Sequence, residues 1–294
     1  MADFIIHLLE SPEEMTAVEA LQRMVWSSSE TDVIPAHMLL AAVHNGGLVL
    51  GAFVDDDLVG VSFGFPGIYS MPDGPRLKHH SHILGVHPDW TGKGIGFALK
   101  RAQWQMVRKQ SLDLITWTFD PLLSRNAHLN ISCLGAVCNT YLRSEYGEMH
   151  DDLNSGLPSD RFQVDWWLNT KRVELRLSRL ARLALTLHHY LSAEATLFEA
   201  YSDRGPALCP PEKTSSFTGT LLLIEIPSNF LILKASDLPL ARDWRFYTRE
   251  VFERTFSSGY LITDFVHDTE RSFYVLTHRD SIPLDDETNP DLRG

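Results

Sequence analysis

A glycine-rich segment, Thr91-Gly92-Lys93-Gly94-Ile95-Gly96, follows an apolar stretch that ends at Val86. Glycine lets backbone N–H groups come close to a ligand. The amphipathic pattern after Gly94 predicts a helix, whose N-terminus carries a partial positive charge. Together they predict a site for a phosphate or pyrophosphate. The spacing is neither GxGxxG nor GxxxxGK[ST], so the fingerprints of dinucleotide-binding folds and P-loop proteins are absent.

The charge near this segment also suits an anion. The chain has a formal net charge of −12, yet residues 91–112 contain no Asp or Glu and carry five basic residues: Lys93, Lys100, Arg101, Arg108 and Lys109. A basic island in an acidic protein favours a local anionic ligand, although a solvated helix face is the plainer alternative. The acidic balance argues against nucleic acid or an anionic membrane as the main partner.

Length and composition set the broad class. The 294 residues, 44% hydrophobic and 22% charged, suit a globular protein of two domains or one large one. The three cysteines, Cys133, Cys138 and Cys209, form no CxxC pair, and the first residues lack the basic region of a signal peptide. We therefore expect a reduced, cytoplasmic protein. The weakly apolar window 36–54 is broken at His44–Gly47, which indicates helix, turn and strand rather than a membrane span.

The hydrophobic pattern predicts the elements of the first 168 residues. Ser11 and Pro12 begin the first helix, and a hairpin surrounds the acidic turn at residues 55–57. Expected strands are 5–9, 48–54, 58–65, 79–86, 114–119, 136–142 and 162–167. Expected helices are 12–26, 35–43 and 125–134, with a further helix after the glycine loop whose apolar residues span 95–106. Residues 66–75 are expected to form a loop.

The remaining residues predict a smaller mixed region. A linking helix at 171–197 and a linker at 203–217 precede a strand at 221–226, a helix at 237–256 and strands at 260–267 and 272–277, and the tail from 282 is polar. This β-α-β-β order repeats the last half of the first region. A duplicated half-domain and the chance recurrence of a common order both fit.

The glycine loop after a strand, together with the order β-α-α-β-β-β-α-β-α-β-β over residues 1–168, resembles the GNAT superfamily of N-acetyltransferases. The resemblance implies a mixed α/β (α+β) acyl-CoA N-acyltransferase fold at 1–168. A linking helix and linker at 169–218, a C-terminal β-α-β-β region at 219–280 and a polar tail at 281–294 would follow.

The resemblance also implies a binding site for acetyl-CoA or another acyl-CoA as co-substrate. The loop would hold the pyrophosphate, the strand before it would lie beside the thioester, and an Asn would contact the pantetheine or phosphate arm. These cofactor-binding candidates are Leu84, Gly85, Val86, Thr91, Gly92, Lys93, Gly94, Ile95, Gly96 and Asn126. The family usually has Arg or Gln where this chain has Thr91, and often a Tyr general acid where it has Ile131.

Two histidines are candidates for the general base that takes the proton of an incoming amine. Strand alternation would place His80 and His82 on one face with Leu84 and Val86. Imidazole, with an unperturbed pKa of about 6.5, suits this task near neutral pH. The plainer alternative is structural histidines, and Asp120 is the next candidate for the base. The histidines at 79, 80, 82 and 87 could also suggest a metal site, but no downstream Asp, Glu or Cys with ligand spacing stands out, so we expect no metal.

Two residues are candidates for the acceptor side. Trp117 opens a Trp-Thr-Phe-Asp-Pro-Leu segment, and Arg161 ends the segment 153–161; both segments resemble a little-characterised GNAT branch with a long C-terminal extension. Arg161 could bind a carboxylate bidentately, or it could pair with Asp160 or Asp152.

The expected function is acyl-CoA-dependent N-acylation of a small-molecule amine, with acetyl-CoA as the default donor. No activated Cys or Ser nucleophile stands out, so the amine would attack directly in a ternary complex. One alternative is transfer of a succinyl or other acyl group to an amino acid. Another is a non-catalytic acyl-CoA sensor or interaction protein. We expect the C-terminal region to shape the acceptor site or to make a contact in a homodimer.

Overall fold

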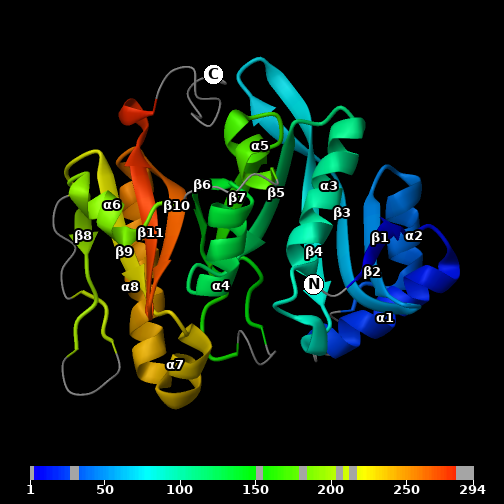
Figure 1. The fold of residues 1–294 in the computed structure, drawn as a ribbon, viewed down its shortest axis with the longest axis horizontal. Coiled ribbons are helices and arrows are strands. Elements are labelled where there is room, and N and C mark those ends of the chain that lie inside the picture. The colour runs from blue at the N-terminus through cyan, green and yellow to red at the C-terminus, as the bar shows by residue number, and fades with distance from the viewer. Residues whose placement is uncertain are drawn as a thin grey trace. The chain divides into compact units, whose positions relative to one another are not determined.

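The structure is a computed structural model that describes residues 3–26, 33–149, 155–178, 184–202, 208–211 and 217–282. The chain divides into two compact units, Met1–Trp117 and Thr118–Gly294, which the colour bar of Figure 1 locates by residue number. The domain limits expected at residues 168 and 218 stay a prediction.

The first unit is a sheet with helices on its faces. Its strands lie in the order β1-β2-β3-β4-β5, antiparallel up to β4, whereas β5 runs parallel to β4. The elements are β1 (Ile5–Leu8), α1 (Pro12–Trp26), α2 (Ala36–His44), β2 (Leu48–Val54), β3 (Asp57–Met71), β4 (Gly74–Val86), α3 (Ile95–Lys109) and β5 (Leu114–Phe119).

Strand alternation divides the apolar side chains of this sheet between two cores. Val49 packs in a cluster with residues of α1 and α2, such as Met15 and Leu39. The next residue, Leu50, packs in a different cluster with Ile95 and Leu99 of α3. The pair α1/α2 and the helix α3 therefore cover opposite faces of the sheet.

The prediction of a loop at residues 66–75 is wrong, because β3 and β4 continue as one long hairpin. They stay paired from Gly60↔Val86 to Met71↔Gly74, and only Pro72 and Asp73 form the turn. The pairing of β2 with β3 ends at Gly64. Pro66 lies beyond this point, where β3 has a partner on one side only and a missing N–H can be tolerated.

The second unit is also built on one sheet, with strands in the order β7-β6-β10-β11-β9-β8. The elements are α4 (Ser124–Ala127), β6 (Val137–Leu142), β7 (Arg161–Trp167), α5 (Lys171–Leu177), α6 (Leu187–Ser192), β8 (Thr196–Phe198), β9 (Leu221–Ile226), α7 (Phe230–Ser236), α8 (Leu238–Ser257), β10 (Tyr260–Asp268) and β11 (Arg271–His278).

Two helix predictions in this unit need correction. The linking helix expected at 171–197 is instead α5, α6 and β8: Ser178 is already extended after α5, and Thr186 starts α6 with its own capping box. The helix expected at 125–134 begins as α4 and continues as a π-helix over His128–Cys133. Residues 203–207 and 212–216 of the expected linker, and the tail from 283, lie outside the described residues.

The predicted C-terminal β-α-β-β string is present as β9, α8, β10 and β11, and it shares a sheet with β6 and β7. Strand β10 pairs antiparallel with β6, the strand that holds the same place in the earlier string, through Ile262↔Cys138. Strand β8 runs parallel to β9, as β4 does to β5.

Candidate functional site

The glycine loop forms an open cradle at the start of α3. After β4, a 3-10 turn at Pro88–Trp90 leads into Gly92 and Gly94, whose φ angles are 79° and 87°. Gly94 is the N-cap of α3, makes no side-chain cap, and has nothing within 4 Å of the position a Cβ would take. The first-turn N–H groups of a helix have no intrahelical acceptor. Here they start beside open space, and the first turn contains no acidic residue, so an anion is favoured.

The two polar side chains of the loop, Thr91 and Lys93, make different contacts. The Thr91 hydroxyl donates to Pro88 O at 2.9 Å, so its hydrogen is used within the loop. The Lys93 Nζ lies 3.9 Å from the centroid of the Trp90 ring, and both Thr91 and Lys93 are exposed. A Cβ on Gly96 would lie 3.8 Å from Leu84, so the first turn of α3 packs onto β4 at an ordinary contact distance.

His80 and His82 lie on the face of β4 opposite to the one that carries Leu84 and Val86, which corrects the expected alternation. The register shifts from Phe63↔Ile83 to Gly64↔Ser81, so His82 is an extra residue in a β-bulge. The ring centroids of both histidines lie within 6 Å of that of Phe65, at 5.4 and 5.8 Å.

The two cores confirm this assignment of faces. Phe65 packs against the core of α1 and α2. Leu84 and Val86 pack against the core of α3 instead. The bulge therefore reverses the alternation between the histidines and the end of the strand.

Both histidines are held neutral. Burial first, and then the charge of His82, lowers the pKa of His80 to about 4. Burial also lowers the pKa of His82. Their ring centroids are 6.0 Å apart. A neutral imidazole has a lone pair and can accept a proton at pH 7, although a lower pKa makes it a weaker base.

A buried polar cluster lies on the other face of β4, and we did not predict it from sequence. The Lys100 side chain is 1% exposed, donates to Ser81 Oγ at 2.7 Å and to Gln103 Oε1 at 3.1 Å, and its Nζ lies 3.7 Å from the centroid of the Trp117 ring. The Gln103 amide contacts His79 Nε2 at 3.3 Å. Lys100 is therefore not part of the solvent-facing basic island.

A helical spacing in the sequence could have revealed this cluster. Lys100, Gln103 and the buried Val107 follow one another at i, i+3 and i+7.

The elements of residues 1–168 follow the order that the GNAT resemblance implies, with β5 parallel to β4 and the glycine loop between β4 and α3. The expected mixed α/β order of elements is therefore confirmed. No protein-family model matches the sequence, and no curated protein matches it.

Solved structures similar to this chain include three acetyltransferases. The first is a putative GNAT acetyltransferase from Desulfovibrio desulfuricans (15% identity, 56% of this chain and 99% of that one, TM-score 0.45). The second is Ard1 from Thermoplasma volcanium (16% identity, 56% and 97%, TM-score 0.42). The third is the ribosomal-protein-S18-alanine N-acetyltransferase of Escherichia coli (12% identity, 62% and 100%, TM-score 0.44).

Asp120 and Arg161 belong to a buried ion-pair network of the second unit. Asp120 Oδ2 lies 2.5 Å from Arg245 Nη2 and 3.9 Å from Arg161 Nη1, and Asp120 Oδ1 accepts from the Leu122 N–H. Arg161 also donates to the backbone oxygen of Asp160, whereas the Asp160 carboxylate accepts two hydrogen bonds from Arg249 at 2.8 Å. These contacts account for both residues without a role in acyl transfer. Asp152 lies outside the described residues.

The remaining candidates lie in different elements of the two units. Asn126 is exposed on α4, and Ile131 is fully buried in the π-helix, so no proton donor stands at that position. Trp117 is buried against Lys100, as described above, and Gly85 packs against Trp26, where a Cβ would come within 2.7 Å.

Neither a metal centre nor a membrane span is found within the described ranges. They contain no group of three or more His, Cys, Asp or Glu placed to hold a metal ion. In the same ranges, no helix has the length and apolar character needed to cross a bilayer.

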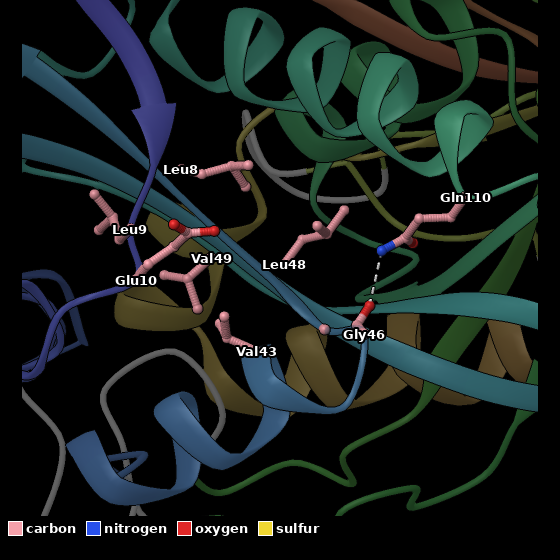
Figure 2. A pocket seen from close by; sticks show the side chains of 9 residues that line it. Leu8, Leu9, Glu10, Val43, Gly46, Leu48, Val49 and Gln110 are labelled. Carbon is pink, nitrogen blue, oxygen red and sulfur yellow. Dashed lines mark hydrogen bonds between the residues drawn. The ribbon is translucent and has the colours of Figure 1, made fainter.

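The first unit has a cavity of about 200 Å³, and none of the residues predicted for the site lines it. Figure 2 shows that Glu10 and Gln110 are the polar side chains at this cavity, and that the Gln110 amide donates to Gly46 O, at 3.0 Å. The other lining residues are Leu8, Leu9, Val43, Gly47, Leu48 and Val49.

Proposed function

We propose that this protein is an N-acyltransferase that transfers an acyl group, by default acetyl, from CoA to a small-molecule amine. The observation that carries the proposal is the cradle at Gly92–Gly96, where two glycines with positive φ open a helix start that has no acidic residue in its first turn. A pyrophosphate is the part of acyl-CoA that this cradle would hold, with Lys93 as the nearest basic side chain of the loop.

The residues of β4 would act on the thioester. Leu84, Gly85 and Val86 supply backbone groups beside it, and one N–H would stabilise the developing oxyanion. Asn126 would contact the pantetheine or phosphate arm. The amine nitrogen forms a bond to the acyl carbon, the carbon–sulfur bond breaks, and His80 or His82 takes the amine proton, directly or through a water molecule. Because Ile131 has no proton to give, CoA would leave as the thiolate.

A non-catalytic acyl-CoA sensor is the second candidate. The buried Ile131 and the internal hydrogen bond of Thr91 favour it, since both remove side-chain contacts that the family usually supplies. An amino-acid acceptor bound by Arg161 has less support, because Arg161 is buried and close to Asp120. A cytoplasmic location, a homodimer and the domain limits given above are part of the same proposal.

Calorimetry with CoA tests the cradle. Gly94→Asp adds a negative charge where the pyrophosphate would lie, and we expect parental binding to be lost. Gly147→Asp is the matched control, because Gly147 also has a positive φ, of 66°, and also has open space at its Cβ position. Equal CoA affinity in the parent and a folded Gly94→Asp variant would overturn the assignment. Turnover with a panel of amines, followed by thiol release, separates the enzyme from the sensor.

A further inference from the structure

A cavity of about 260 Å³ in the second unit is lined by residues that each carry a polar group, although carbon atoms form most of its surface. It is lined by Ser124, Arg125, His128, Ser228 and His267, which come from α4, the π-helix, the segment after β9 and the end of β10. None of these five carries a carboxylate, although the chain as a whole is acidic.

The hydrogen bonds behind the cavity have only one consistent direction. The Ser228 hydroxyl donates to the backbone oxygen of Glu270, because a carbonyl can only accept. Ser228 therefore has no hydrogen left for Ser272 Oγ at 3.0 Å, and Ser272 must be the donor in that pair. The single hydrogen of Ser272 is then used as well.

The two remaining partners of Ser272 must consequently donate to it. These are Ser124 Oγ at 2.9 Å and His267 Nδ1 at 3.0 Å. Ser272 is fully buried, so water does not replace these partners. His267 therefore carries a hydrogen on Nδ1 and donates it to Ser272.

The cavity wall therefore offers hydrogen-bond acceptors to a ligand, and Arg125 adds one fixed positive charge. Ser124 and Ser228 can offer only oxygen lone pairs to a ligand. Burial first, and then the neighbouring His267, lowers the pKa of His128, so the His128 imidazole is neutral at pH 7. Arg125 is exposed and permanently charged.

We propose that this cavity binds a small amino acid in its zwitterionic form. The carboxylate would pair with the Arg125 guanidinium, and the ammonium group would donate to Ser124 and Ser228. A simple anion would face the lone pairs of the wall, and a simple amine would face Arg125, so either fragment alone fits less well. The site does not depend on acyl transfer.

Binding of L-alanine, acetate and ethylamine to the full chain without CoA tests this proposal. We expect L-alanine to bind at least tenfold more tightly than either fragment in calorimetry or ligand-observed NMR. Arg125→Gln should weaken L-alanine at least tenfold, whereas Arg108→Gln, an exposed arginine at the end of α3, should leave it unchanged.

A second variant tests the direction of the hydrogen bonds. Ser272→Ala frees the hydrogens of Ser124 and His267, so in a folded variant L-alanine should weaken while acetate strengthens. Equal affinities for acetate and L-alanine, no effect of Arg125→Gln, or no L-alanine binding at roughly 10 mM would each overturn the proposal. Because CoA is absent throughout, these outcomes are independent of the cradle at Gly94.

Discussion

The ammonium group of Lys100 lies 3.7 Å from the centre of the Trp117 ring, on the buried side of α3. Burial lowers the pKa of Lys100 well below its usual value. The aromatic ring and the two acceptors Ser81 and Gln103 favour the charged form instead. This lysine therefore holds α3, β4 and β5 together in the unit that carries the glycine loop.

Truncating Lys100 should destabilise the fold. Lys100→Ala removes the stem packed on Trp117 and leaves the acceptors Ser81 and Gln103 without their buried donor, so we expect a loss of about 2–4 kcal/mol in the free energy of unfolding. Urea denaturation would measure it. Lys109→Ala, at the exposed end of the same helix, should change stability by less than about 0.5 kcal/mol. Equal effects of the two variants would contradict a structural role for Lys100.

If His80 or His82 is the general base, as we propose, the pH–rate profile should depend on the pKa of that histidine. Only the neutral imidazole accepts a proton, and the pKa of His80 is about 4, so a rate that depends on His80 should stay level near neutral pH and fall as pH drops through about 4. His80→Ala or His82→Ala should lower kcat by about a hundredfold while CoA affinity is retained. His44→Ala, an exposed histidine, is the control. Parental rates in both strand variants would exclude these histidines as the base.

His79 should make the protein less stable in mild acid. Burial, and then the charges of Lys100 and His80, lowers its pKa to about 3, against about 6.5 in an unfolded chain. Between these values the unfolded state binds the proton more readily, so stability falls as pH decreases through 6.5. The linkage relation gives a loss of about 2 kcal/mol at pH 5 relative to neutral pH. Denaturation at both pH values would show a smaller difference for His79→Gln, and an unchanged difference would refute this account.

The variant Asp120→Asn tests whether Asp120 has a catalytic or a structural role. Asp120→Asn removes the charge that Arg245, 2% exposed, depends on, and breaking a buried pair costs about 3 kcal/mol or more. Glu253→Gln is the matched control, because its partner Arg143 is exposed and such surface pairs contribute less than about 1 kcal/mol. If Asp120→Asn kept its stability and lost most of its rate, Asp120 would be the general base.

The order of elements was predictable because its signals are local. Short apolar runs rich in aliphatic and aromatic residues mark β2 and β5, Ser11 and Pro12 mark the start of α1, and three closely spaced glycines mark the loop before α3. Prolines in the β3–β4 hairpin misled the prediction, since whether a proline can stay in a strand depends on which neighbours pair with it.

The site was less predictable because its contacts depend on tertiary pairing. The face of His80 depends on a bulge at His82, and a bulge exists only relative to the partner strand. The pairing of Asp120 with Arg245 joins residues 125 positions apart, and no local pattern marks it. The face of Lys100 could have been inferred, because its spacing to Val107 was visible in the sequence.

The pairing of β10 with β6 has a consequence for how this chain meets other chains. A sheet that ended at β6 would present a row of unsatisfied backbone donors and acceptors, which invites strand-by-strand association. Here the C-terminal region occupies that side of β6 and moves the outer boundary of its sheet to β8, which is only three residues long. The protein thus supplies its own neighbour for β6, so self-association through that strand would first require the chain to release part of itself.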